Sequence, residues 1–200
     1  ANFVEKVQQG KSYWKSNNND NMKFNAIVGN PPYQVMDGGN KASATPAYNL
    51  FVDVAKKINP DYISMIIPAK WYNGGRGLDD FRTAMLDDTR IKKLVDYEDS
   101  NDCFNGVDIA GGVCYFLWDK TYSGLCSVIS VANGKVSKKE RRLWEYKTFV
   151  RSSEAILIIE KISNYENAKF LNVHVSSQKP FGLRTYIKPE EKGDIILRYS

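Results

Sequence analysis

Short apolar runs alternate with helical patterns through the first half of this chain, and that alternation constrains its fold more than any other feature. The runs typical of buried strands are residues 24–29, 62–67 and 91–97. Between them, residues 47–58 and 78–87 carry apolar side chains at helical spacing. Strands separated by helices require right-handed crossovers. The sequence therefore predicts an α/β sheet with helices on its faces.

Two further apolar runs, 113–118 and 125–131, are so closely spaced that we expect antiparallel pairing at the end of the sheet. Residues 30–45 are rich in Pro, Gly and Asn and predict a loop. After about residue 134 basic residues dominate, and we place a domain boundary near residue 150. The expected parts are 1–22, a short helix and a loop; 23–134, the main α/β part; and 135–200, a basic linker and the start of a second domain.

The composition favours a protein of the reducing cytoplasm with a polyanionic partner. The 200 residues carry a formal charge of +5 and have a pI near 9.0, a balance that tilts toward nucleic acid. Three cysteines without CxxC spacing indicate reduced thiols, and a single histidine argues against a metal site or His-centred catalysis. No apolar run reaches the length of a membrane span, and the first residues lack signal-peptide character.

The residues with the clearest chemical implication are Asn30, Pro31, Pro32 and Tyr33, which directly follow the first predicted strand. Active sites of open α/β sheets lie beyond the carboxyl ends of the strands. The side-chain oxygen of Asn30 and the carbonyl of Pro31 are two acceptors that can hold the hydrogens of an amino group, whose delocalised lone pair makes it a poor nucleophile. Two prolines, which lack N–H donors and have fixed φ angles, would hold these acceptors rigidly for methyl transfer.

Tyr33 adds a flat face on which a base rotated out of a duplex can stack. No general base is needed before such a transfer, which suits a chain without an available histidine. The simpler interpretation is a proline turn at the end of a strand. The preceding strand, together with Gly29 as a hinge, favours the catalytic interpretation.

Residues 24–34 resemble the catalytic motif of amino-methyltransferases, and the sequence that follows resembles the adenine-specific (N6) DNA methyltransferases of restriction–modification systems, type IIG enzymes in particular. The downstream stretches that carry this resemblance are 48–55, 66–71, 74–82 and 103–118. The resemblance covers about residues 22–120 well. Residues 176–183 more loosely resemble the entry to a DNA target-recognition domain.

This resemblance implies a partial Rossmann-like methyltransferase sheet that moves a methyl group from S-adenosyl-L-methionine to the N6 amine of a flipped adenine in double-stranded DNA. It implies that Asn30 and Pro31 hold that amine and that Tyr33 stacks on the ring. It also places Phe104 as a second aromatic residue against the base, for which ordinary core packing is the alternative.

The resemblance further places Leu50 and Phe51 near the cofactor, although packing between helix and sheet also explains them. The basic stretch 135–151 is interleaved with aromatic residues and either neutralises DNA phosphates or is a solvated hairpin or helix face. Two more basic residues follow the second predicted strand, at the motif's edge of the sheet. The residues that we expect to contact DNA are Lys70, Arg76, Lys138, Lys139, Arg141 and Arg142.

The Asn-Pro-Pro-Tyr motif also occurs in enzymes that methylate RNA amines or protein glutamine, which are the main enzymatic alternatives. A different class is a non-catalytic DNA-specificity subunit with a degenerate methylase fold. The long linker 98–112 and the expected second domain favour a DNA enzyme, and an intact Asn30 and Tyr33 argue against degeneracy. The recognised sequence, and the presence of a fused or partner endonuclease, stay open.

The glycine-rich cofactor loop of this family is missing from the sequence, since Gly74, Gly75 and Gly77 have the wrong spacing. The chain also lacks an initiator Met and stops in mid-pattern, so we interpret it as part of a longer protein with that loop upstream. We expect residues 1–200 alone to bind S-adenosyl-L-methionine weakly and to transfer no methyl group. Calorimetry measures the binding, and micromolar affinity would contradict this expectation.

Overall fold

The computed structural model describes residues 24–36, 44–75 and 77–164. Predictions for the helix at 2–9, for Arg76 and for the recognition-domain entry at 176–183 lie outside these residues. The chain divides into two compact units, Ala1–Ile156 and Leu157–Ser200, and the sheet described below belongs to the first.

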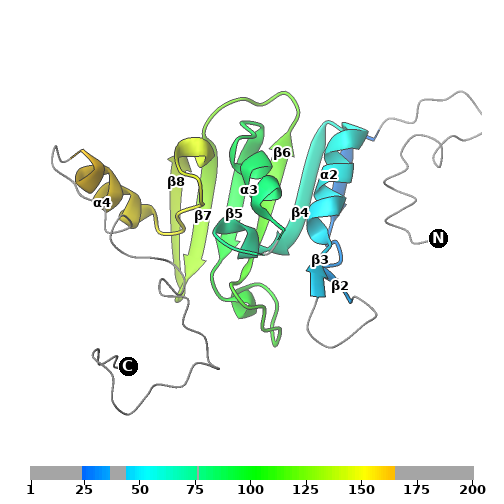
Figure 1. Ribbon diagram of the computed structural model, residues 1–200, viewed down its shortest axis with the longest axis horizontal. Coiled ribbons are helices and arrows are strands. Elements are labelled where there is room, and N and C mark those ends of the chain that lie inside the picture. Colours follow the sequence, from blue (N-terminus) through cyan, green and yellow to red (C-terminus); the bar gives the residue numbers. More distant parts are fainter. Residues whose placement is uncertain (1–23, 37–43, 76, 165–200) are drawn as a thin grey trace, which may run out of the picture. The chain divides into compact units, whose positions relative to one another are not determined.

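The elements follow one another along the chain as labelled in Figure 1. The strands are β1 (Ala26–Gly29), β2 (Gln34–Met36), β3 (Ala44–Pro46), β4 (Tyr62–Pro68), β5 (Ile91–Tyr97), β6 (Val113–Asp119), β7 (Cys126–Ala132) and β8 (Lys135–Arg141). The α-helices are α2 (Tyr48–Ile58), α3 (Asp79–Leu86) and α4 (Ser153–Ser163). The short 3-10 helices are η2 (Ala69–Tyr72), η3 (Ser100–Asp102) and η4 (Leu143–Glu145).

Within the described residues, six strands form one mixed sheet in the order β1-β4-β6-β5-β7-β8. β1 pairs in parallel with β4, and β5 pairs in parallel with β7. β6 lies antiparallel between β4 and β5, and β8 is antiparallel to β7. The ends of β1, β4, β5 and β7 therefore share one edge of the sheet, called here the carboxyl edge. The predicted α/β fold is confirmed. The sheet does end in an antiparallel pair, β7 with β8, but the runs 113–118 and 125–131 do not pair with each other, because β5 lies between β6 and β7.

The core lies between the sheet and the two helices α2 and α3, which cover the same face (Figure 1). The apolar stripe of α2 buries Tyr48, Val52 and Ala55, and the helix ends at Asn59, whose left-handed backbone (φ 60°) closes its last turn. On the opposite face of the sheet, residues such as Tyr115 and Leu117 are only half-buried. None of the described helices is long and apolar enough to cross a membrane.

The structure differs from the sequence-based expectation at two places. Residues 34–36 and 44–46, expected as loop, pair as the small antiparallel ribbon β2–β3, whose three-residue strands are too short to show a pattern. Residues 135–141, expected as linker, form β8 and pair with β7 along its full length, and the first compact unit extends to Ile156. The lysines of β8 hide the strand from a hydrophobic pattern because it is an edge strand, where exposed charges are common.

The glycine that the fold requires is Gly112, at the start of β6, and not Gly29. Gly112 has a φ of +77°, and a β-carbon there would meet the backbone carbonyls of Tyr97 and Glu98. Gly29 has no positive φ, and a β-carbon on it would meet no described atom within 4 Å. Neither backbone strain nor crowding therefore requires a glycine at position 29, where a hinge was expected.

Asp88, in the turn between α3 and β5, joins three elements of the core. Its carboxylate accepts from Lys56 Nζ of α2 (2.8 Å), from Arg90 Nε (2.7 Å) and from Trp118 Nε1 of β6 (3.0 Å). Burial opposes ionisation of this carboxyl, but the hydrogen bonds from Arg90 and Lys56 outweigh it and lower its pKa to about 2.

A carboxyl whose pKa falls on folding stabilises the protein above its unfolded pKa, and this stability is lost as the pH falls through the folded pKa. For Asp88 the window is from about 4 to about 2, and the shift corresponds to about 2 kcal/mol. We expect wild type to lose about that much more unfolding free energy across this window than Asp88→Asn does. Urea titrations at several pH values measure it, with the exposed neighbour Asp87→Asn as a control that should behave like wild type.

Candidate functional site

The four motif residues begin directly beyond β1, at the carboxyl edge of the sheet. Asn30 is exposed, Pro31 is buried, Pro32 is exposed and Tyr33 is half-buried. The carbonyl of Tyr33 accepts a hydrogen bond from the backbone N–H of Ala47 (3.1 Å), so the end of the motif is tied to the start of α2. This contact fixes the far end of the two-proline segment, while the pairing of Gly29 with Met65 fixes its beginning.

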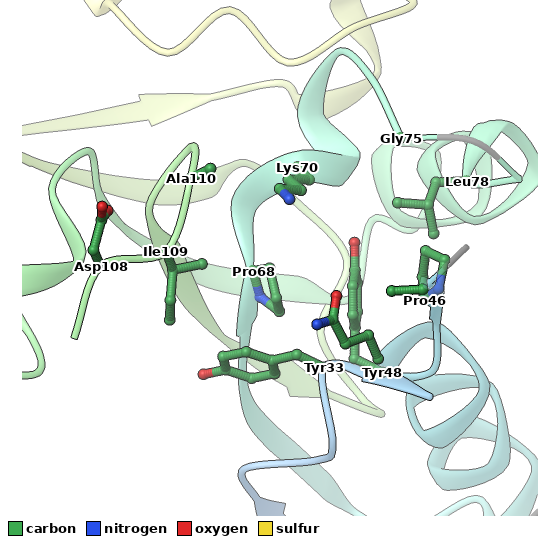
Figure 2. A pocket seen from close by; sticks show the side chains of 12 residues that line it. Tyr33, Pro46, Tyr48, Pro68, Lys70, Gly75, Leu78, Asp108, Ile109 and Ala110 are labelled. Atoms are coloured by element: carbon green, nitrogen blue, oxygen red, sulfur yellow. The ribbon is translucent and has the colours of Figure 1, made fainter. Parts of the chain in front are cut away.

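A pocket of about 400 Å³ opens beside Tyr33 at this edge (Figure 2). Its volume lies within the range of roughly 300–1,000 Å³ that is usual for small-molecule sites. Apolar walls come from Pro46, Pro68, Leu78 and Ile109. The polar side chains that line it are Tyr33, Gln34, Tyr48, Lys70 and Asp108. In Figure 2, Asp108 and Tyr48 lie on opposite sides of the pocket.

Two tyrosine hydroxyls at this pocket are buried without a hydrogen-bond partner among the described residues, those of Tyr33 and Tyr48. Burial raises the pKa of Tyr33, with smaller contributions from Cys103 and Cys114. Burial also raises the pKa of Tyr48 well above its ordinary value, with Cys114 adding and Arg82 opposing. Both hydroxyls therefore stay protonated and are available as donors.

The loop 98–112 forms one side of the site and is ordered by its own hydrogen bonds. The buried Ser100 hydroxyl donates to the carbonyl of Val107 (2.6 Å) and accepts from the backbone N–H of Ile109 (2.8 Å). The carbonyl of Gly112 accepts from the N–H of Ala69 (3.0 Å), which joins this loop to the end of β4. The loop thereby brings Asp108 and Ile109 to the pocket.

Arg82 of α3 holds the segment that carries Lys70. Its buried guanidinium donates to the carbonyls of Trp71 (2.6 Å) and Gly74 (2.8 Å) and to the carboxylate of Asp79 (2.7 Å). These bonds satisfy backbone carbonyls of the segment that follows β4 and is no longer paired in the sheet. The position of Lys70, which belongs to this segment, therefore depends on the segment's contacts with Arg82.

Arg151 and Asp96 form a two-bond ion pair at the carboxyl edge. Asp96 is fully buried near the end of β5 and accepts from Arg151 Nε (2.8 Å) and Nη2 (2.7 Å). The same guanidinium donates to the carbonyl of Gly111 (2.8 Å) and lies over the ring of Tyr72 (5.3 Å). Burial lowers the pKa of Arg151, but the hydrogen bonds to Asp96 outweigh this and raise it.

The residue expected beside the base lies in the loop 98–112, and those expected near the cofactor lie on α2. Phe104 is half-buried in the loop 98–112, and its N–H donates to the carbonyl of Ser100 (2.7 Å). Phe104 and its neighbour Cys103 belong to the loop between β5 and β6, which lies at the same carboxyl edge as the motif tyrosine. Leu50 and Phe51 are half-buried on α2. Phe104, Leu50 and Phe51 do not line the pocket, and their roles toward base and cofactor stay predictions.

The basic residues expected to contact DNA fall into distinct places. Lys70 is exposed and lines the pocket. Lys138 and Lys139 are exposed on β8, where consecutive residues point to opposite faces of the sheet. Arg142 is exposed beyond β8, at the edge opposite to the motif, because β8 runs away from the carboxyl edge.

Arg141 differs from the expectation because its side chain is buried. Its Nη1 donates to the carbonyl of Val150 (2.7 Å), and its guanidinium lies over the ring of Phe149 (4.7 Å). Burial lowers its pKa. A guanidinium used in this way supports the chain after β8, and we leave it out of the proposed DNA contacts.

The three cysteines are free thiols, as expected, with Cys114 and Cys126 buried and Cys103 half-buried. Burial raises the pKa of Cys114 to about 12 and that of Cys126 to about 12. Burial also raises the pKa of Cys103. Thiols in this state are weak nucleophiles, so we assign no nucleophilic role to any of the three.

A mixed α/β sheet with an Asn-Pro-Pro-Tyr segment beyond its first strand and a pocket at the same edge is the arrangement expected of an amino-methyltransferase. The model of the Eco57I restriction-modification methylase family matches residues 1–104, more than half of the chain. The chain belongs to this family of restriction-modification methylases.

A relative from Mycoplasma pneumoniae (strain ATCC 29342 / M129 / Subtype 1), described as an uncharacterized adenine-specific methylase, is 36% identical over 165 residues. The match covers 80% of this chain, and the chain spans about a third (36%) of the relative. The expectation of an adenine-methylase family is confirmed.

Two solved structures are similar at a greater distance. The type IIG restriction endonuclease BpuSI is 16% identical, with 71% of this chain and 22% of that chain covered and a TM-score of 0.48. A type I restriction-modification methyltransferase subunit from Streptococcus thermophilus is 12% identical, with 84% and 35% covered and a TM-score of 0.45. The family assignment rests on the sequence matches alone.

The sequence analysis missed three contributors to the site, namely Tyr48, Asp96 and Arg151. Tyr48 begins a predicted helix and could have been noticed because helices after a parallel strand start at the carboxyl edge. Asp96 is an acidic residue that directly follows the apolar Leu94 and Val95 in a predicted buried strand, which predicts a charged partner. Nothing in the sequence indicated that this partner would be Arg151, 55 residues further on.

We expect Arg151→Ala to lower the free energy of unfolding by about 3 kcal/mol, because it leaves the buried carboxylate of Asp96 without its partner. Equilibrium unfolding in urea measures this loss. The double variant Arg151→Ala/Asp96→Ala should lose less than the sum of the two single variants. The exposed Arg142→Ala is the matched control and should stay within about 0.5 kcal/mol of wild type; an equal loss in both arginine variants would refute the assignment.

Proposed function

We propose that the full-length protein transfers a methyl group from S-adenosyl-L-methionine to the N6 amine of an adenine rotated out of double-stranded DNA, within a restriction–modification system. The observation that carries this proposal is the motif's position. An exposed Asn30 and a tethered two-proline segment lie beyond a parallel strand, beside a pocket. Membership of the methylase family and the adenine-specific relative support it.

In this mechanism the Asn30 side-chain oxygen and the Pro31 carbonyl accept the two hydrogens of the adenine amine. They pull the nitrogen toward a tetrahedral geometry and stabilise the positive charge that develops as its lone pair attacks the methyl group. The nitrogen then loses one proton to water. Tyr33 stacks on the base through its ring, and Phe104 flanks the base from the loop 98–112.

The cofactor supplies the methyl group as a sulfonium. Leu50 and Phe51, half-buried on the helix that starts at the motif's edge, are the residues of this chain that we assign to its binding. Their apolar side chains suit contact with a flat or apolar part of the cofactor rather than with its charged groups. Because the substrate is DNA, we place the protein in the cytoplasm.

For DNA contact we propose Lys70 and the exposed lysines of β8, which adds Lys135, at the carboxyl edge, to the expected Lys138 and Lys139 farther along the strand. Five strand spacings separate β1 from β8, which is about 24 Å, or roughly seven base pairs along a duplex. A duplex with its target adenine at Tyr33 could thus reach both groups. Arg142 lies about 20 Å from that edge, at the far end of a seven-residue strand, and is a weaker candidate.

The decisive test is methyl transfer by the full-length protein to duplex DNA, with single-stranded RNA as the competing substrate. We expect Asn30→Ala to lower turnover by about 100- to 1000-fold, because one preorganised acceptor is lost. Radiolabelled methyl transfer under single-turnover conditions measures it. Tyr62→Phe, at the other end of β4, is the control and should keep wild-type activity. Near-normal turnover by Asn30→Ala would refute the mechanism.

A further inference from the structure

Two side chains that line the pocket, those of Tyr48 and Lys70, can donate hydrogen bonds into it. The side chain of Tyr48 is 2% exposed, and its hydroxyl has no hydrogen-bond partner among the described residues. Lys70 is exposed, lines the same pocket and makes no ion pair within the part of the chain that the structure describes. Figure 2 shows both side-chain tips pointing into the pocket.

A buried hydroxyl without a partner costs free energy, on the order of that of a lost hydrogen bond. Phenylalanine at position 48 would fill the same space without this cost. Tyr48 thus carries a hydroxyl that no described residue uses as a hydrogen-bond partner. Burial raises the pKa of this hydroxyl, so it stays protonated and can donate to an acceptor that enters the pocket.

The charge at this end of the pocket selects a negatively charged acceptor. Lys70 contributes an ammonium group that makes no ion pair among the described residues, whereas the Arg82 guanidinium is already paired with Asp79. Tyr48 also begins the eleven-residue helix α2, which has no side-chain cap at its N-terminus. The positive end of a helix favours anions. The carboxylate that lines the pocket, Asp108, lies on its opposite side (Figure 2).

We propose that Tyr48 Oη and Lys70 Nζ form a phosphate subsite that holds the DNA backbone next to the nucleotide stacked on Tyr33. This inference rests on the proposed function for its source of phosphate. The motif binds the amine of the base with acceptors, and the subsite binds the backbone of the same strand with donors. Tyr48 is a positioning residue in this scheme, since it touches the substrate's backbone and not the reacting atoms.

The first test needs no methyl transfer. Binding of the full-length protein to a random-sequence DNA duplex is measured by fluorescence anisotropy at several salt concentrations. We expect Tyr48→Phe to weaken binding about 10-fold, as for loss of a hydrogen bond to a charged group. Lys70→Gln should reduce the slope of log K against log salt by about 1. Tyr62→Phe and Lys57→Gln, at the other end of β4 and of α2, are the matched controls and should bind as wild type does.

The stability of the free protein separates binding from folding. Tyr48→Phe should melt at the same temperature as wild type or higher, because it removes an unpaired buried hydroxyl. A variant that is more stable yet binds DNA more weakly has lost a ligand contact. A lower melting temperature together with unchanged DNA binding would overturn the proposal, because the hydroxyl would then be a structural group.

The second test locates the phosphate. The methylated sequence is read from genomic DNA of cells that express the protein, and duplexes of this sequence then carry a single neutral methylphosphonate at each position near the target adenine. At one position the substitution should weaken wild type about 10-fold and Tyr48→Phe hardly at all, since both changes remove the same contact. Additive losses at every position would overturn the subsite.

Failure of the subsite and failure of the proposed function are distinguishable. Absence of N6-methyladenine from that DNA would refute the proposed function, and the salt-dependence experiment would still decide the subsite. A Tyr48→Phe variant that binds S-adenosyl-L-methionine more weakly, with DNA binding unchanged, would assign the anion to the cofactor's carboxylate and overturn the proposal.

Discussion

The organisation of this site depends on one pairing, the insertion of antiparallel β6 between β4 and β5. All seven residues of β6 pair with β4, and six of them pair with β5 on the other side. Because β5 ends at the carboxyl edge and β6 begins there, the whole linker 98–112 has to stay at that edge. The linker that carries Phe104 and Asp108 therefore lies beside the strand that carries the motif. Gly112, which no other residue can replace without displacing two carbonyls, makes the entry into β6 possible.

The ion pair between Arg151 and Asp96 stabilises the same junction from the other side. Asp96 is opposite Cys114 of β6, and Arg151 also donates to Gly111, so one guanidinium joins the end of β5, the end of the linker and the chain that returns from β8. A buried carboxylate is costly unless it is paired. The pair thus specifies the path of residues 142–151 more than it adds net stability. Arg82 does the equivalent for the segment with Lys70 through three carbonyl and carboxylate acceptors.

Local patterns in the sequence predicted most elements but not how they pair. The boundaries of α2, β4 and β5 follow from apolar spacing and from the breaks at Asn59 and Pro68, which are local properties. The position of β6 between earlier strands depends on pairing between residues about 50 apart, which no local pattern contains. β8 was not predicted as a strand because its exposed lysines are also typical of a linker. The direction of β8 places Lys135 at the carboxyl edge and Arg142 at the opposite edge. Lys135 is therefore a proposed DNA contact, and Arg142 is a weaker candidate.

At the carboxyl edge, the proposed hydrogen-bond acceptors and donors lie on different segments. This separation supports the proposed orientation of the nucleotide. The Asn30–Pro31 segment follows β1 and offers acceptors, whereas Lys70 follows β4 and Tyr48 begins the helix between these two strands, and both offer donors. Neighbouring strands lie about 4.8 Å apart, which is within the span of one nucleotide. A nucleotide carries donors on the adenine amine and acceptors on its phosphate. Under the proposal, the amine of the adenine faces the acceptors of the motif and the phosphate faces the donors of Tyr48 and Lys70. Orientation of the amine toward the motif then follows from the polarity of the edge itself.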